Sequence, residues 1–200
     1  MHAPIEYLGS CCLFRGSTMT TSPARARLQE LFRERALQFG DFTLASGKKS
    51  SYYVNSKKVL FHAEALSLLG ELLYEVTSDL DFQAIGGLEV GAIPMAAAAL
   101  TTFHKYGRSI EGFFVRKQAK AHGSKELVEG QVRPNDRVVV IDDVLTTGGS
   151  VLQAIQAVEE VGAKVLRVVC ICDRLQGAGE ALAKYEYRPI FTVRDFGIQV

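Results

Sequence analysis

Residues 138–150 read Val138-Val139-Val140-Ile141-Asp142-Asp143-Val144-Leu145-Thr146-Thr147-Gly148-Gly149-Ser150, and this segment is the strongest indication of the architecture. Its first four residues are apolar without alternation, which is typical of a strand buried on both faces of a parallel sheet. Two carboxylates follow, then a turn of small residues, then an amphipathic segment. We therefore predict a strand over 137–141 and a helix over 149–161 that ends at Gly162.

The turn after this strand has the properties of an anion site. In open parallel sheets, ligands bind beyond the carboxyl ends of the strands, and Asp142 and Asp143 fall at that edge. The run Thr146 to Ser150 can direct backbone N–H groups and hydroxyls at one phosphate, at the positive end of a helix dipole. Carboxylates beside a phosphate suit sugar hydroxyls or a metal ion. We expect both aspartates to lie exposed in a cleft.

Strands and helices alternate along the rest of the chain. Apolar residues at helical spacing predict helices at 23–39, with Ser22 as its cap and Gly40 at its end, and at 63–76, 92–106 and near 179–185. Strand-like runs lie at 42–44, 51–55, 82–85, 112–116, 165–172 and 189–193. The run 165–172 is again apolar at every position. The chain is therefore expected to be α/β, with a parallel sheet covered on both faces.

The composition limits the classes of protein. The 200 residues are 48% apolar and 22% charged with a net charge of +1, as in a globular domain. A nucleic-acid binder would carry a basic excess, so binding to nucleic acid is not expected. No run reaches the roughly 18 uncharged apolar residues of a membrane span, so a membrane partner is not expected either. Four cysteines form no disulfide or zinc pattern, which favours the reducing cytoplasm. Residues 1–21 are expected to be an extension of a single domain over 22–200.

Three kinds of site share a strand with carboxylates at its end. A Walker B strand needs a GxxxxGK[ST] loop, which the chain lacks. A dinucleotide fold needs GxGxxG after a strand, and the glycines of 86–91 have a different spacing. The third is the PRPP site of type I phosphoribosyltransferases, whose apolar strand, acidic pair and T-[TA]-G-[GT]-[ST] loop residues 138–150 resemble at every position. An ordinary strand–turn–helix with incidental Asp and Gly is the alternative without function.

The resemblance implies a fold and a set of ligands. The type I phosphoribosyltransferase fold has a central, mostly parallel sheet flanked by helices, a small N-terminal hood and a flexible catalytic loop. The 5-phosphate of PRPP would bind the loop 146–150, and Asp142 and Asp143 would contact the ribose hydroxyls directly or through Mg²⁺ and water. Mg²⁺ would be held mainly by substrate oxygens, so no protein metal cage is expected.

A basic segment narrows the family. Residues 115–123 (VRKQAKAHG) resemble the R-K-x-x-K-x-H-G catalytic loop of orotate phosphoribosyltransferases. The resemblance implies that the departing pyrophosphate is stabilised by Arg116, Lys117, Lys120 and His122. The polar run 117–131, broken by glycines, is predicted to be a long mobile loop. A solvated basic loop is the alternative without function.

Three further segments resemble the same family. Residues 42–53 (FTLASGKKSSYY) resemble its F-x-L-x-S-G-x-x-S-x-Y-[YF] segment, and Asp173-Arg174 resemble its D-R pair. The resemblance implies that Tyr52, Tyr53 and Thr146 bind orotate and that Arg174 anchors its carboxylate, which suits a guanidinium fork. The loop that meets the pyrophosphate would be Glu89-Val90-Gly91. The expected activity joins orotate to the ribose 5-phosphate of PRPP, in pyrimidine biosynthesis, in a homodimer with shared active sites.

Two departures from the family pattern concern lysines. Some members have a lysine where this chain has Ala45 or Gly91. The contacts of these lysines with PRPP would have to come from elsewhere, and the nearby lysines are Lys48, Lys49, Lys57 and Lys58.

Two rival functions fit less well. A purine phosphoribosyltransferase has no reason for the basic segment or Arg174, and a PRPP-sensing regulator would need a DNA-binding module, for which residues 1–24 are too few.

Overall fold

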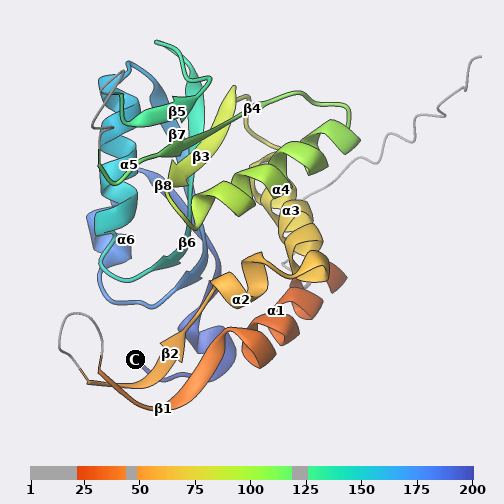
Figure 1. The fold of residues 1–200 in the computed structure, drawn as a ribbon, viewed down its shortest axis with the longest axis vertical. Coiled ribbons are helices and arrows are strands. Elements are labelled where there is room, and N and C mark those ends of the chain that lie inside the picture. Colours follow the sequence, from red (N-terminus) through yellow and green to blue (C-terminus); the bar gives the residue numbers. More distant parts are fainter. Residues whose placement is uncertain (1–21, 44–48, 119–125) are drawn as a thin grey trace, which may run out of the picture.

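The computed structural model describes residues 22–43, 49–118 and 126–200. Six strands form one sheet in the order β5-β4-β3-β6-β7-β8 (Figure 1). All neighbours are parallel except β5, which is antiparallel to β4 at the edge of the sheet. The strands are β3 (Ala84–Leu88), β4 (Glu111–Val115), β5 (Val128–Gly130), β6 (Arg137–Leu145), β7 (Lys164–Asp173) and β8 (Glu186–Thr192).

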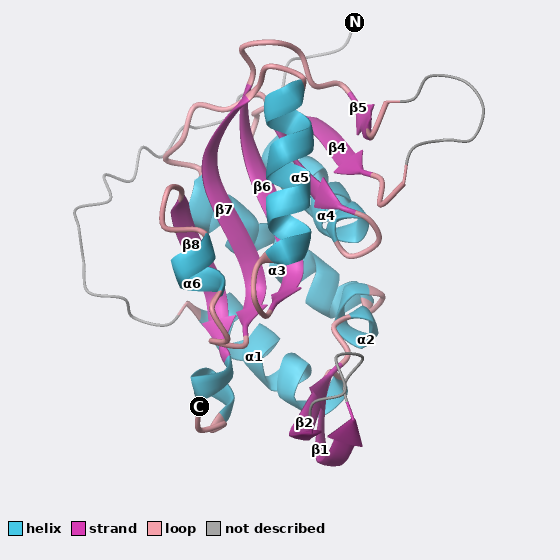
Figure 2. Cartoon of the chain, turned by 90° about the vertical axis from the view of Figure 1, so that its left-hand side faces the viewer, coloured by secondary structure: helices cyan, strands magenta, loops and turns pink. Residues whose placement is uncertain are grey.

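Helices cover both faces of this sheet (Figure 2). The helices are α1 (Pro23–Arg35), α3 (Ala63–Thr77) and α4 (Ala92–Lys105) on one face, and α5 (Gly149–Glu160) and α6 (Ala178–Ala181) on the other. The pleat of β6 explains the division, because Val139 and Ile141 belong to the first core and Val138 and Val140 to the second. The prediction of an α/β fold with a mostly parallel, doubly covered sheet is confirmed.

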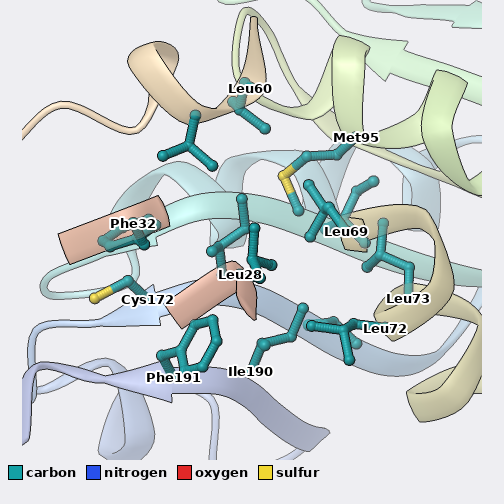
Figure 3. Close-up of a cluster of buried hydrophobic side chains, with 14 of the residues drawn as sticks. Leu28, Phe32, Leu60, Leu69, Leu72, Leu73, Met95, Cys172, Ile190 and Phe191 are labelled. Atoms are coloured by element: carbon teal, nitrogen blue, oxygen red, sulfur yellow. The ribbon is translucent and has the colours of Figure 1, made fainter. Parts of the chain in front are cut away.

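The larger core lies between the sheet and α1, α3 and α4. Figure 3 shows Leu28 and Phe32 of α1 close to Ile190 and Phe191 of β8. The Phe32 ring also stacks on Phe196, with 5.0 Å between the ring centroids. Phe196 belongs to a 3-10 helix (Val193–Phe196) that follows β8. Burying each such side chain contributes about 1.5–3 kcal/mol, so this core fixes α1 and the carboxyl-terminal end of the chain against each other.

A small two-stranded unit follows α1. Strand β1 (Leu37–Thr43) pairs antiparallel with β2 (Lys49–Val54), and the short helix α2 (Lys57–Leu60) leads on to α3. We call the described part of residues 37–60 the hood. It lies at the end of the molecule where β6 and β7 finish, because side chains from both strand ends contact it. The predicted small N-terminal hood is therefore present.

The first helix is shorter than its sequence pattern suggests. It begins at Pro23, and the Ser22 side chain accepts a hydrogen bond from the N–H of Arg25, as a cap should. It ends at Arg35 rather than at residue 39, because 37–39 pair with residues 52–54 of β2. The apolar residues of 37–39 fit the helical spacing, but they belong to strand β1 of the hood.

Several strands also differ from their predicted limits, since β1 begins before residue 42 and β8 begins at Glu186 rather than at 189. Strand β3 continues through Gly86 and Gly87, and β6 continues to Leu145 instead of stopping at Ile141. The strand β5 lies within the predicted loop 117–131, where it pairs with β4. A Cβ at Gly86 would come within 1.9 Å of the Phe113 carbonyl oxygen. Glycine therefore allows β3 to run close between its neighbours.

The predicted helices at 63–76, 92–106 and 149–161 agree with the structure to within one residue.

Candidate active site

The two aspartates lie within β6, near its end, and not after it. The prediction that they are exposed is wrong, since Asp142 is 5% and Asp143 7% exposed. The reason is that β6 remains paired with β7 as far as Leu145. The hood then contacts the same strand end. Within the described part of the chain, the two carboxylates accept hydrogen bonds from Ser56, Lys57, Ser150 and a backbone N–H, so neither is the partner of a structural arginine there.

Asp142 is held by hydrogen bonds from neutral groups. Its Oδ2 accepts a hydrogen bond of 2.7 Å from the Ser150 hydroxyl, and its Oδ1 accepts one of 2.8 Å from the N–H of Asp143. Burial, and then the negative charge of Asp143, raise the pKa of Asp142 to about 7. This carboxyl therefore takes up a proton close to neutral pH.

Asp143 is held by groups from the hood. The Lys57 Nζ donates to Oδ2 of Asp143 over 2.7 Å, and the Ser56 hydroxyl donates to the same oxygen. Burial alone would raise the pKa of Asp143, but the hydrogen bonds from Lys57 and Ser56 outweigh it and hold this pKa below its usual value. A Cβ at Gly91 would lie 2.5 Å from the carboxyl of Asp143, so that position needs glycine. The acidic pair is thus asymmetric, with the charge on Asp143.

The loop 146–150 joins β6 to α5. Gly148 has a φ of +86°, which glycine adopts without steric cost. The N–H of Leu152 donates to the Gly148 carbonyl and begins the helical pattern, so the N–H groups before it lie at the open end of α5. Thr147, Gly149 and Ser150 are exposed there. This arrangement offers donors and the positive end of a helix dipole to an anion.

The segment 89–91 lies between β3 and α4 and meets the start of the basic segment. The N–H of Glu89 donates to the Val115 carbonyl over 2.8 Å, and Oε1 of Glu89 accepts a hydrogen bond of 2.9 Å from the N–H of Lys117. The Gln153 amide of α5 donates to the Lys117 carbonyl over 3.3 Å. The structure therefore brings Lys117 beside this segment and beside α5.

The other basic residues are placed less completely. Arg116 follows β4 and forms an ion pair of 3.6 Å with Glu129 of β5. Lys120 and His122 lie outside the described residues, as do all of residues 119–125 of the predicted mobile loop. The roles predicted for Lys120 and His122 therefore stay predictions.

Arg174 connects the end of β7 to the hood. Its Nε donates to the Tyr52 hydroxyl over 3.2 Å, and its Nη2 lies 3.5 Å from the Ser50 hydroxyl. The guanidinium also lies over the Tyr52 ring, 4.6 Å from its centroid. Tyr53 points elsewhere, because neighbouring residues of a strand face opposite sides, and its exposed ring packs on Phe42. The structure brings Tyr52 and Arg174 together, and Tyr53 does not join them.

Comparison with known proteins identifies this arrangement. Residues 56–197 match the model of the phosphoribosyl transferase domain. An orotate phosphoribosyltransferase of Corynebacterium glutamicum is 41% identical over 184 residues, which span 91% of this chain and 98% of that protein. The chain belongs to the orotate phosphoribosyltransferase family.

Solved structures of orotate phosphoribosyltransferases agree with the fold. The Mycobacterium tuberculosis enzyme in complex with Fe(III) dicitrate has a TM-score of 0.78 and 42% identity, covering 88% of this chain and 100% of that one. The same enzyme in complex with PRPP has a TM-score of 0.75 and 38% identity, with the same coverage. The type I phosphoribosyltransferase fold is therefore confirmed.

The residues of this orotate phosphoribosyltransferase fold that sequence reasoning did not assign lie in the hood. Ser56 and Lys57 contact Asp143, and Ser50 lies near Arg174. Of the lysines near the hood, Lys58 is exposed, and no ion pair joins it to another described residue. The helix α2 has only four residues, too few for an apolar period to show. Only the presence of several lysines in this stretch pointed to a cation here.

The acidic pair also bears on metal binding. Within the described ranges, no group of three or more His, Cys, Asp and Glu side chains lies close enough to hold a metal ion. Asp142 and Asp143 supply hard carboxylate oxygens, and the hydrogen bonds of Asp142 come from neutral donors. This set fits Mg²⁺, which is bound through one or two carboxylates together with substrate phosphates.

None of the helices in the described part of the chain is long and apolar enough to cross a membrane.

Proposed function

We propose that this protein is an orotate phosphoribosyltransferase, which transfers the ribose 5-phosphate of PRPP to orotate and releases pyrophosphate in pyrimidine biosynthesis. The observation that carries the proposal is the buried pair Asp142 and Asp143 at the end of β6, directly before an open helix end at 146–150. Carboxylates suit ribose hydroxyls, and a helix N-terminus suits a phosphate. The two ligand types lie side by side in one phosphoribosyl group.

The chain binds PRPP through three segments in this proposal. The 5-phosphate binds Thr146, Thr147, Gly148, Gly149 and Ser150. Asp142 and Asp143 accept hydrogen bonds from the ribose hydroxyls. The segment Glu89-Val90-Gly91 meets the pyrophosphate, and the hydrogen bond from the backbone N–H of Lys117 to Glu89 supports this role, since it holds the start of the basic segment beside it. The Ser150 hydroxyl, which donates to Asp142, links the phosphate loop to the acidic pair.

The reaction breaks the C1–O bond of PRPP, and its electron pair leaves with the pyrophosphate. N1 of orotate forms the new bond to C1 from the opposite face, and its proton passes to the solvent. Arg116, Lys117, Lys120 and His122 stabilise the charge on the departing pyrophosphate. Orotate binds between the hood and the end of β7, at Tyr52, Thr146 and Arg174, and Tyr53, which faces away from them, is left out of this set. Arg174 has five N–H donors, and its two contacts in the hood leave others for the orotate carboxylate.

Mg²⁺ is the proposed cofactor. Asp142 and Asp143 are the residues that would hold it, together with oxygens of PRPP. When bound, it neutralises charge on the pyrophosphate. We further propose that the protein works in the cytoplasm.

A homodimer with shared active sites completes the proposal. The basic segment of one subunit would serve the site of its partner. Mixing inactive Lys120→Ala with inactive Asp143→Asn should then restore part of the activity, because one site of a mixed dimer has both intact parts. Absence of recovery after confirmed subunit exchange would contradict a shared site.

The direct test is consumption of orotate in the presence of PRPP and Mg²⁺, followed by its ultraviolet absorbance. We expect turnover with orotate and none with adenine, hypoxanthine or uracil. Turnover with a purine base, and not with orotate, would contradict the proposed substrate. It would leave the proposed PRPP site in place.

A further inference from the structure

The hood carries a cation that reaches the acidic pair. Lys57 is the first residue of α2, and its side chain is 52% exposed, yet its Nζ lies 2.7 Å from Oδ2 of Asp143. Ser56, the cap residue of the same helix, is buried and donates to the same oxygen. Two consecutive residues of the hood therefore converge on one carboxylate oxygen, 86 residues further along the chain.

The opposite side of this carboxylate is also fixed. A Cβ at Gly91 would lie 2.5 Å from Oδ1 of Asp143. The carboxylate is thus confined between the hood, which holds Oδ2, and the segment 89–91, which lies against Oδ1. Oδ2 is saturated by two donors from this chain. A ligand that binds Asp143 must therefore use the lone pairs of Oδ1. The hood thus determines which oxygen of this carboxylate a ligand can reach.

The charge arrangement requires this partner. A buried carboxylate without a cation is strongly unfavourable, and removing one partner of a buried pair costs more than the pair itself gains. The neighbouring Asp142 is also a carboxyl group, but its hydrogen-bond donors, the Asp143 N–H and the Ser150 hydroxyl, are neutral. Lys57 is the cation in contact with this pair among the described residues. Asp143 is therefore the member of the pair that a cation of the hood holds in place.

The hood has a second contact with the sheet, and it differs in kind. Arg174 reaches Tyr52 through a hydrogen bond and through the face of the ring. That contact holds the hood to β7 without touching the acidic pair. Loss of Lys57 would therefore leave the hood attached through Arg174, while Asp143 would lose its cation.

We propose that Lys57, assisted by Ser56, is a positioning residue that holds the Asp143 carboxylate in the orientation in which it meets the ribose of PRPP. This inference rests on the proposed function, because it assumes that Asp143 binds the phosphoribosyl group. Lys57 acts through Asp143 and not through the base. The KM for PRPP therefore depends on Lys57, whereas the KM for orotate does not.

The test compares Lys57→Met, Lys57→Arg and the matched control Lys58→Met, whose side chain is exposed on the same short helix. Loss of a hydrogen bond to a charged group corresponds to roughly tenfold or more in affinity, so we expect the KM for PRPP to rise by about that factor in Lys57→Met. The KM for orotate should stay unchanged. Lys57→Arg should recover most of the loss, and Lys58→Met should behave as the unaltered protein. Equal kinetics for Lys57→Met and Lys58→Met would overturn the proposal.

A double variant separates positioning from direct contact with substrate. If Lys57 acts through Asp143, Lys57→Met should add little to the defect of Asp143→Asn, because the two changes remove one unit. Defects that multiply in the double variant would instead show that Lys57 binds PRPP on its own, and the proposal would fail. Ser56→Ala provides a milder second case, with a smaller rise in the same KM. A melting temperature close to that of the unaltered protein in each variant excludes misfolding.

The proposed function can fail separately. If the unaltered protein does not consume orotate, the substrate assignment is wrong, and the role of Lys57 is then measured by calorimetric titration with PRPP and Mg²⁺. The expected result is a Kd for PRPP that is about tenfold weaker in Lys57→Met than in Lys58→Met. Equal Kd values, or no PRPP binding by the unaltered protein, would overturn the inference about Lys57.

Discussion

Two groups of buried charge lie at different places in the sheet, and they are built in opposite ways. In the first, the buried member is a cation: Arg167 of β7 is 2% exposed and pairs with Asp79 over 2.7 Å and Glu186 over 2.8 Å. Both carboxylates are half exposed, at 54% and 42%. In the second, the carboxylates Asp142 and Asp143 are buried, and the cation, Lys57, is half exposed.

The two groups also differ in how completely the protein satisfies them. Arg167 donates to two carboxylates and to the Val76 carbonyl, which leaves only its Nε without a partner. The second group has two buried carboxylates and a single cation. Saturated buried charge serves the fold, whereas buried charge left partly uncompensated suits a ligand that brings hydroxyls or a metal ion. Substitutions in the two groups should therefore affect different quantities.

The largest effect is expected at the acidic pair. Asp142→Asn and Asp143→Asn should each lower kcat/KM by about a hundredfold, because each removes a carboxylate oxygen that accepts a hydrogen bond from the ribose. The melting temperature should stay within a few degrees, since an amide at either position ends the unfavourable juxtaposition of two buried carboxyl groups. Steady-state kinetics and thermal unfolding of the same samples check both parts. If either variant is strongly destabilised while its folded fraction keeps full activity, the acidic pair serves the stability of the fold and not the reaction.

Arg167→Met should show the converse behaviour. Breaking a fully buried ion pair costs about 3–5 kcal/mol, and we expect about 2 kcal/mol here because both partner carboxylates are half exposed. For a chain of this size that lowers Tm by about 4–8 °C. The kcat/KM of the folded protein at low temperature should not change. A kinetic defect without loss of stability would show that this group serves the active site.

Gly91→Ala should have an intermediate effect that is confined to the site. The new Cβ would meet the carboxyl of Asp143 at 2.5 Å, so the carboxylate has to shift. A displacement of this kind should lower kcat/KM by about tenfold. Gly179→Ala in α6 is the control, because a Cβ there meets nothing within 4 Å. Equal activity of the two variants would mean that Asp143 tolerates displacement, contrary to the confinement described for it.

The smallest effect concerns pH. Hydrogen bonds from Arg167 lower the pKa of Asp79 and of Glu186 below their usual values. A lowered pKa in the folded state adds stability at pH values above the ordinary carboxyl pKa, and this stability is lost as the pH falls through the folded pKa. Because both carboxylates are half exposed, the contribution should be below about 1 kcal/mol. The difference in free energy of unfolding between the unaltered protein and Arg167→Met should therefore shrink from pH 7 to pH 3. A difference that grows toward low pH would contradict this origin.

Much of the fold could be predicted because its signals are local. The uninterrupted apolar run of β6 and the small residues after it indicate a buried parallel strand and the start of a helix. The error at the first helix has a different source. Residues 37–39 fit a helical spacing, and only their pairing with residues 52–54 of β2 places them in a strand. Pairing of that kind is not contained in the periodicity of either segment.

The site divides in the same way. The identity of Asp142, Asp143 and the loop after them follows from a contiguous motif, and the structure brings them together. Their burial could not be predicted, because it depends on the length of β6 and on the hood. Lys57 had only a weak signal, since α2 is four residues long and its contact with Asp143 spans 86 positions. Contacts between distant segments decide the electrostatics of this site.

The hydrogen bond between Arg174 and Tyr52 has a consequence for how the chain folds. It joins residues 122 positions apart, across most of the sheet's strands. Contacts of such separation form only after the entropy of closing the intervening chain has been offset by other interactions. Strand β7 must join the sheet before Arg174 can reach the hood. We therefore expect the hood to gain this anchorage late, after β7 has joined the sheet.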